Sequence, residues 1–155
     1  MAIPTTVKNV MISGLPGEIA FDGPTRVITA LVATADASNV FGRAFTYTDE
    51  AVESVSAGGT NGFAGILINP KAYGIGSLGV VPQGRSAEFL QMGEVYVQLA
   101  NSGGTIGDLV YYVNATGALG SGTAGAGQTQ IPNATVVRHN VSAENPYLAV
   151  IRLTN

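Results

Sequence analysis

The sequence predicts an all-β protein: a small β-barrel, or a compact sandwich, of about seven to eight short strands with an extended N-terminal arm. Three observations predict it. Short apolar runs rich in β-branched residues alternate with turns of Gly, Pro and Asn. The 155 residues include 21 glycines and 7 prolines, which interrupt the chain too often for long helices. Residues 95–99 alternate with a period of two, as a strand does.

The stretch from Leu90 to Leu119 is predicted to be the centre of the barrel. It contains two apolar segments, Gln91–Leu99 and Asp108–Val113, joined by residues 101–107, which are rich in Asn and Gly. Such residues adopt the positive φ angles that tight reversals need. We therefore expect the two segments to pair as a hairpin that supplies rigidity rather than catalysis.

Residues 1–24 are predicted to be an extended arm, and residues 25–155 a single β-barrel domain. Prolines and glycines exclude long regular structure in the arm. The arm nevertheless carries apolar side chains that must be buried against something. Two interpretations remain open: the arm contacts a partner, or it forms a first edge strand of the same domain. The candidate contact residues are Val10, Met11, Ile12, Leu15, Ile19 and Phe21.

The rest of the chain is expected to consist of short strands between loops. Residues 49–57 could begin a helix, but two glycines end it so early that an extended segment is preferred. The loop at 70–87 is a candidate binding element, and the Gly-rich residues 117–130 are expected to be flexible. The predicted strands are residues 26–34, 40–48, 62–69, 135–141 and 148–153.

The composition indicates a protein that associates with other chains. Apolar residues make up 46% of the chain and charged residues only 11%, well below the usual quarter. A surface with so few charges is poorly protected against association. We therefore expect the protein to pack against copies of itself or against a partner.

Several classes of function are excluded by composition. The net charge is −3, and the 7 lysines and arginines are scattered, so no basic footprint for nucleic acid exists. The absence of cysteine excludes disulfides and thiolate chemistry. No apolar run is long enough to span a membrane. The N-terminus lacks the pattern of a secretion signal, so we expect synthesis and use without export through that route.

No residue pattern supports catalysis, a cofactor or a metal. Residues 74–79 match G-x-G-x-x-G, but proline and glycine follow where a nucleotide site needs a helix. His139 is the only histidine, and no G-x-S-x-G accompanies it. Asp49, Glu50 and Glu53 could form a weak cation site, but a solvated acidic patch is preferred. We expect no enzymatic activity.

Tyrosines on the predicted strands are candidate contacts between subunits, because aromatic side chains are enriched at interfaces. Tyr111 and Tyr112 are adjacent, so one ring should face inward and the other outward. The alternative is that the outward ring is simply a half-exposed side chain of the sheet. The candidate intersubunit residues are Tyr96, Tyr111 and Tyr112.

Short motifs in a definite order run from about residue 14 to the end of the chain. They are Gly14-Leu-Pro-Gly-Glu18, Phe41-Gly-Arg-Ala-Phe45, Phe63-Ala-Gly-Ile-Leu67 with Pro70, Met92-Gly-Glu-Val-Tyr-Val97, Gly107-Asp-Leu-Val-Tyr111, Thr116-Gly117 and Ala149-Val-Ile-Arg-Leu153. In this order and spacing, the chain resembles the head-decoration, or structural cement, proteins of tailed bacteriophages. The likeness covers most of the chain.

The resemblance implies a small β-barrel with an arm, and a non-enzymatic role in the virion without a cofactor. Such proteins decorate the exterior of the capsid and bridge neighbouring capsomers, often as trimers at three-fold positions. The implied partners are the major capsid protein and further copies of the chain, with no nucleic acid and no membrane. Synthesis would take place in the host cytoplasm. The apolar arm then becomes the candidate capsid-gripping element.

Two alternatives remain. A tail or baseplate subunit of a phage would share this composition. A carrier-type ligand-binding barrel is the other, because Gly93-Glu-Val and Gly107-Asp-Leu-Val are similar to the hairpins of biotinyl and lipoyl carriers. Carriers need a modifiable lysine at a hairpin tip, whereas the only central lysine, Lys71, follows Pro70 in a predicted loop.

Overall fold

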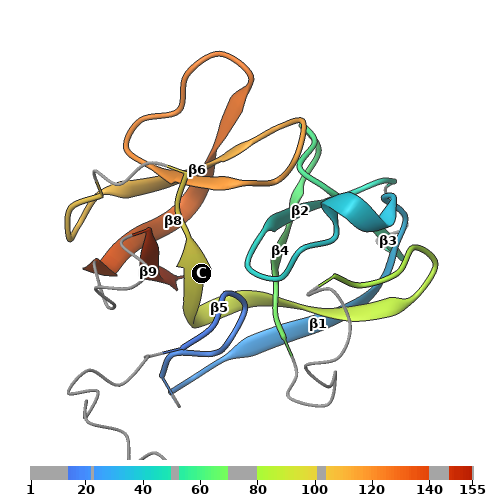
Figure 1. The fold of residues 1–155 in the computed structure, drawn as a ribbon, viewed down its shortest axis with the longest axis horizontal. Coiled ribbons are helices and arrows are strands. Elements are labelled where there is room, and N and C mark those ends of the chain that lie inside the picture. Colours follow the sequence, from blue (N-terminus) through green and yellow to red (C-terminus); the bar gives the residue numbers. More distant parts are fainter. Residues whose placement is uncertain are drawn as a thin grey trace, which may run out of the picture.

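Strand β5 (Ser86–Gln98) runs through both halves of the molecule and connects them (Figure 1). The structure, a computed structural model, describes residues 14–21, 23–49, 53–69, 80–100, 104–139 and 147–154. The first part of β5, to residue 92, pairs with one set of strands, and residues 93–98 pair with another. Gly93, at φ +130°, lies where β5 passes from the first set to the second.

The first half is a closed five-stranded barrel. Its strands are β1 (Arg26–Val32), β3 (Ser54–Ala57), β2 (Ala44–Tyr47), β4 (Phe63–Leu67) and the first part of β5, which pairs with both β4 and β1. A turn of 3-10 helix, η1 (Asp36–Ser38), follows β1. The rings of Phe45 and Phe89 fill the interior, with their centroids 5.1 Å apart.

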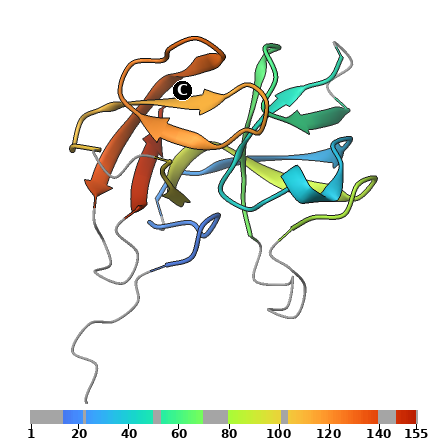
Figure 2. The same ribbon diagram turned by 45° about the horizontal axis from the view of Figure 1, so that its top comes forward.

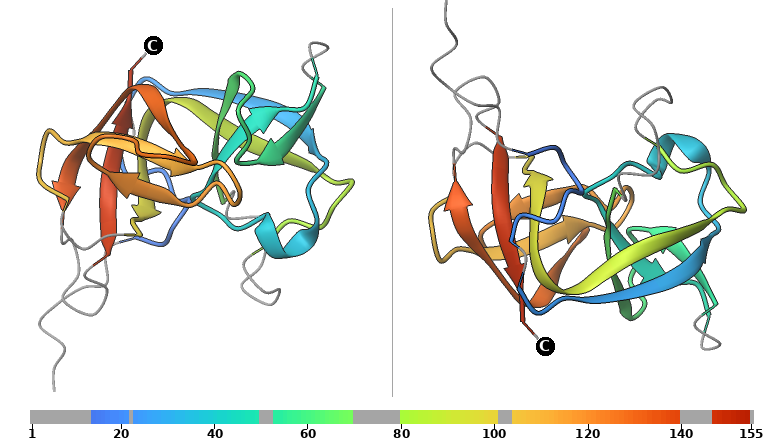
Figure 3. Two further views of the ribbon diagram at one scale, coloured as in Figure 1. Left: turned by 90° about the horizontal axis from the view of Figure 1, so that it is seen from above. Right: turned by 90° about the horizontal axis from the view of Figure 1, so that it is seen from below.

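The second half is an antiparallel sheet that continues from the last residues of β5. Its other strands are β9 (Leu148–Leu153), β8 (Gln128–His139), β6 (Leu109–Val113) and β7 (Leu119–Ser121), in that spatial order. The N–H of Ala100 donates to the carbonyl of Leu119 at 2.7 Å, so the sheet curls back toward the end of β5. The two halves lie side by side, and β5 runs along both (Figures 2 and 3).

Each half has its own hydrophobic core, and β4 and β5 face both cores. Leu67 and Phe89 point into the barrel, whereas their neighbours Ile66 and Leu90 point out of it into the core under the second sheet. Strands buried on both faces have continuous apolar sequences rather than alternating ones. This explains the unbroken small and apolar run at residues 64–68.

Close backbone contacts at a turn also join the two halves. The turn at residues 114–117 follows β6 and lies against the ends of β2 and β3. The N–H of Ala44 donates to the carbonyl of Gly117 at 2.9 Å, and the N–H of Gly59 donates to that of Asn114 at 2.7 Å. A Cβ at Gly117 would lie 2.3 Å from the carbonyl oxygen of Ala44. Glycine is therefore required there.

The all-β fold class and the barrel are confirmed: of the described residues, 54% are strand and 3% are helix, and they form nine strands. The segment before Gly58 is extended, as β3. The predicted hairpin is wrong, because β9 and β8 lie between β5 and β6. The expected flexibility of residues 117–130 is also wrong, since they contain β7 and the start of β8.

A candidate interaction surface on the N-terminal segment

Residues 14–21, here called the N-terminal segment, lie along the free edge of the last part of β5. The N–H of Gly17 donates to the carbonyl of Tyr96 at 2.7 Å, and the N–H of Tyr96 donates to that of Glu18 at 2.9 Å. The N–H of Ala20 donates to the carbonyl of Glu94 at 2.8 Å, which makes the pairing antiparallel around Ile19 and Val95. Residues 17–20 of the predicted arm are therefore paired with the last part of β5 in the same chain.

Two glycines allow the N-terminal segment to pack closely against the side chains beneath it. Gly14 lies over the ring of Tyr96, and a Cβ at Gly14 would come within 2.4 Å of that ring. Gly17 is wedged against Phe41, and its carbonyl accepts a hydrogen bond from the N–H of Asn69 at 2.8 Å. Both glycines have positive φ angles, +80° and +86°, which other residues rarely adopt. The sequence thus fixes the path of the segment.

The apolar side chains of the N-terminal segment face solvent although its backbone is held in place. Ala20 packs against a small cluster on the outer face of the second sheet, formed by Tyr96, Leu148 and Val150. Leu15, Ile19 and Phe21 are 54%, 40% and 61% exposed. An ordered segment that presents large apolar side chains to solvent is typical of an interaction surface rather than a core element.

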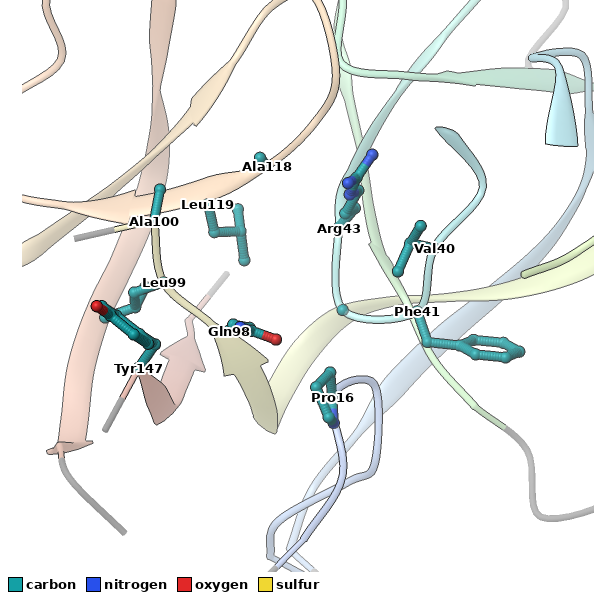
Figure 4. A pocket seen from close by; sticks show the side chains of 11 residues that line it. Pro16, Val40, Phe41, Arg43, Gln98, Leu99, Ala100, Ala118, Leu119 and Tyr147 are labelled. Atoms are coloured by element: carbon teal, nitrogen blue, oxygen red, sulfur yellow. The ribbon is translucent and has the colours of Figure 1, made fainter. Parts of the chain in front are cut away.

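A cleft of about 420 Å³ lies next to this segment, between the two halves. Pro16 forms one wall, and Figure 4 shows that Phe41 and Arg43 come from the barrel side while Leu119 comes from the second sheet. Tyr147, which is 41% exposed, lies at the same cleft. Of the N-terminal segment, Pro16 is the residue that lines the cleft.

Of the six predicted contact residues, the structure describes three. Leu15, Ile19 and Phe21 form the exposed surface just described, and Val10, Met11 and Ile12 lie outside the described residues. Sequence reasoning missed Tyr147 at the cleft. An aromatic residue directly after Pro146, between two predicted strands, is a signal that could have identified it.

The three candidate intersubunit tyrosines lie at different depths. Tyr96 is 9% exposed and is covered by Gly14, whereas Tyr111 is half-buried against Gly120. Tyr112 is 1% exposed and stacks on Phe63, so its ring belongs to the core of its own chain. Burial raises the pKa of Tyr112 above 10.0, and the hydroxyl of Thr129 opposes this shift with a smaller effect.

The described residues hold no group of three His, Cys, Asp or Glu side chains that could bind a metal ion. Among the same residues, no helix is long and apolar enough to cross a membrane. The G-x-G-x-x-G stretch at residues 74–79, Lys71 and Glu50 lie outside the described part of the chain, as does the side chain of His139.

These features define a class: an all-β protein built around a barrel, with an apolar surface on an edge segment held by hydrogen bonds. The family follows from comparison with known proteins. The family model for the structural cement protein (E217 gp24/Pam3 gp6) matches residues 3–154, and the chain belongs to this family. The resemblance inferred from the sequence motifs is thereby confirmed.

A solved structure shares the fold. A chain in the capsid of Myoviridae Phage XM1 is 18% identical, with a TM-score of 0.75 over 100% of this chain and 99% of that one. No curated protein sequence matches the chain. The family is one of non-enzymatic structural proteins of bacteriophages, so the protein has a structural role associated with the capsid and belongs to the virion.

Proposed function

We propose that the protein decorates the exterior of the capsid and clamps neighbouring capsomers, as a homotrimer bound to the major capsid protein. The observation that supports this most is the N-terminal segment. Its backbone is fixed to β5 while Leu15, Ile19 and Phe21 face solvent. In this proposal, the preceding residues, with Val10, Met11 and Ile12, continue the same contact. Synthesis takes place in the host cytoplasm.

The physical basis of the proposed clamp is linkage between binding and shell stability. A protein that binds only the mature arrangement of the shell stabilises that arrangement by mass action. Burying a large apolar side chain contributes about 1.5–3 kcal/mol, and roughly half of this is still available at these half-exposed residues. Because the backbone of the segment is already ordered, binding there costs little conformational entropy.

A triple substitution tests the surface while leaving the fold intact. We expect L15S/I19S/F21S to weaken binding to cement-free expanded capsids by roughly 100-fold, from about 1 kcal/mol at each site. Co-sedimentation measures binding, and circular dichroism checks the fold. The matched control is I106S/L109S, which removes two exposed apolar side chains elsewhere, of 69% and 49% exposure. The control should bind as the wild type does.

Deleting residues 2–13 tests the other half of the proposed contact, because it leaves the paired segment on β5 in place. We expect weaker binding to shells and unchanged folding. If both this deletion and the triple variant bind as the wild type does, the N-terminal region is not the gripping element. The mass of the free protein by light scattering tests the trimer, and the proposal expects three times the chain mass of 15.8 kDa.

A further inference from the structure

The cleft between the two halves combines an apolar lining with one charged side chain. The lining includes Val40 from the barrel side and Leu119 from the second sheet. Of the residues that line the cleft, only Arg43 is charged, and none carries a carboxylate. In Figure 4, Arg43 lies on the barrel side, across the cleft from Leu119. The cleft is therefore mainly apolar, with a single cationic group in its wall.

Arg43 is suited to bind a carboxylate that enters the cleft. It is half-buried, and its guanidinium donates from Nη1 to the carbonyl oxygen of Thr116 at 3.3 Å, which is long for such a bond. A guanidinium has five N–H donors in a planar fork that can hold a carboxylate with two parallel hydrogen bonds. Because salt screens a half-buried charge less than a fully exposed one, a carboxylate binds more strongly here than on the open surface.

The backbone of β5 also faces the cleft. The N–H groups of Tyr96 and Ala100 point away from β9, and they donate to carbonyls of the N-terminal segment and of Leu119 at 2.9 and 2.7 Å. Backbone groups of every second residue of a strand point to the same side. The N–H and C=O of Gln98 therefore point to this side as well, where Gln98 lines the cleft. An extended segment in the cleft would run beside them, as a bound strand does.

We propose that the cleft binds an extended segment of the capsid protein that is both acidic and apolar. A carboxylate of that segment pairs with Arg43, its apolar side chains lie against Leu119 and Tyr147, and its backbone runs beside Gln98. The proposal rests on the capsid function proposed above. It adds to the N-terminal segment a second point of contact with a defined chemistry.

Two features favour the capsid protein over a second copy of this chain as the occupant. Pro16 lines the cleft and belongs to the N-terminal segment, so the cleft adjoins the segment that we propose contacts the capsid. Residues 1–13, which a second copy could offer as an extended segment, contain Lys8 and no aspartate or glutamate. Arg43 would repel this lysine, and like charges placed together suppress binding of the wrong partner.

Photo-cross-linking identifies the occupant directly. We would place p-benzoylphenylalanine at position 147 and irradiate the variant bound to cement-free expanded capsids. Mass spectrometry should find the cross-link on a capsid-protein peptide that contains aspartate or glutamate among apolar residues. The same probe at position 106, where the wild-type side chain is 69% exposed outside the cleft, should not label that peptide. A cross-link from position 147 to a second copy of this chain, to a capsid peptide without an acidic residue, or to nothing would overturn the proposal.

Substitutions at Arg43 test the charge. We expect R43Q to weaken co-sedimentation with capsids by roughly ten-fold, the effect of losing a hydrogen-bonded contact between charged groups. R43K keeps the charge but loses the fork, so its affinity should fall less. The matched control is R85Q, which removes an exposed arginine outside the cleft and should bind as the wild type does. If R43Q binds as well as R85Q, the proposal is wrong.

Salt separates a charge contact from a purely structural role of Arg43. Loss of its bond to Thr116 alone would lower the affinity by the same factor at every salt concentration. Loss of an ion pair should make the affinity of R43Q less sensitive to salt than that of the wild type. Parallel salt curves would overturn the contact with a carboxylate. Circular dichroism checks that each variant is folded.

An ion pair of Arg43 within its own chain would also overturn the proposal. E18Q and E144Q remove the carboxylates that lie within three residues of Pro16 and Tyr147 in the sequence. In urea unfolding without capsids, each should add its own loss to that of R43Q. Non-additive losses would show that the guanidinium already has a carboxylate partner in the free protein.

The same experiments separate this proposal from the proposed function. If L15S/I19S/F21S releases the protein from capsids and R43Q does not, the N-terminal segment contacts the capsid and the proposal for the cleft falls alone. If the wild type does not bind capsids, both proposals fall.

Discussion

The two cores of this protein differ in what encloses them. The barrel core is surrounded by five strands of its own half. The second core lies between the curled sheet and the outer wall of the barrel, where Ile66 and Leu90 project from β4 and β5. The barrel can therefore enclose its core by itself, whereas the second sheet needs the barrel as a wall. Damage to the barrel should affect both halves.

The largest expected effect comes from Phe89, in the barrel core. We expect F89A to destabilise the protein by about 3–5 kcal/mol, because it removes a fully buried ring that packs on Phe45. Urea unfolding followed by circular dichroism and tyrosine fluorescence measures this. Since the second sheet relies on the barrel wall, both signals should change in one transition. Two separate transitions, with the second sheet surviving, would contradict the dependence inferred from the cores.

Gly117 tests the backbone contact that joins the halves. In G117A, the new Cβ would lie 2.3 Å from the carbonyl oxygen of Ala44, so overpacking of about 1–3 kcal/mol adds to a backbone cost of about 1–2 kcal/mol. Gly107 is the control, because it also has a positive φ, +94°, but has open space around it. The free energy of unfolding of G107A should fall only by the backbone cost. If G117A and G107A lost the same free energy of unfolding in chemical denaturation, the close contact at Gly117 would not be stabilising.

The pH dependence of stability reports burial in the second core. The pKa of Tyr112 is raised in the folded protein, so above pH 10.0 the unfolded chain releases this proton while the folded chain retains it. The contribution of Tyr112 to the free energy of unfolding is complete below pH 10.0. It is lost as the pH rises toward the pKa of Tyr112 in the folded protein. Urea midpoints should therefore fall less steeply between about pH 9 and 11 in Y112F than in the wild type. Parallel curves would contradict the burial of this hydroxyl in the core.

The smallest expected effect belongs to the outer face of the second sheet. The guanidinium of Arg152 donates to Oε1 of Glu94 from Nε at 2.9 Å and from Nη2 at 2.7 Å. The side chain of Arg152 is 52% exposed, so solvent screens the pair. We expect R152Q to cost about 0.2–1 kcal/mol, and the cost to shrink further in 1 M salt, by thermal unfolding. A loss as large as that of F89A would mean that this face is not solvated.

The sequence predicted much of the fold through local patterns. Strands near residues 26–34, 62–69 and 148–153 could be recognised because β-branched apolar runs and their breakers are local signals. The hairpin could not be predicted correctly, because a period of two specifies which face a side chain occupies but not which strand lies beside it. Residues 93–98 pair with β9, which follows far along the chain.

The Gly-rich stretch after Gly117 shows a second limit of composition. Gly120 is ordered because the ring of Tyr111 packs directly on its backbone, and a Cβ would lie 2.3 Å from that ring. Gly122 and Gly127 supply positive φ angles at turns. Glycine here permits close packing and tight reversals rather than flexibility, and composition alone does not separate these roles.

The candidate surface was predicted in part. The apolar character of Leu15, Ile19 and Phe21 was evident from the sequence, and the structure adds that these side chains are exposed on a segment whose backbone is hydrogen-bonded to β5.

The antiparallel pairing of the N-terminal segment with β5 has a mechanical consequence. Its hydrogen bonds at Gly17, Glu18 and Ala20 lie across the direction of the chain. A force that pulls on residue 14 along the strand loads these bonds in shear, so they must break together. A force at right angles would break them one after another. If the region before residue 14 is anchored to a shell under outward pressure, the pairing of the N-terminal segment with β5 is oriented to resist the tension, because the load is shared by all of its hydrogen bonds.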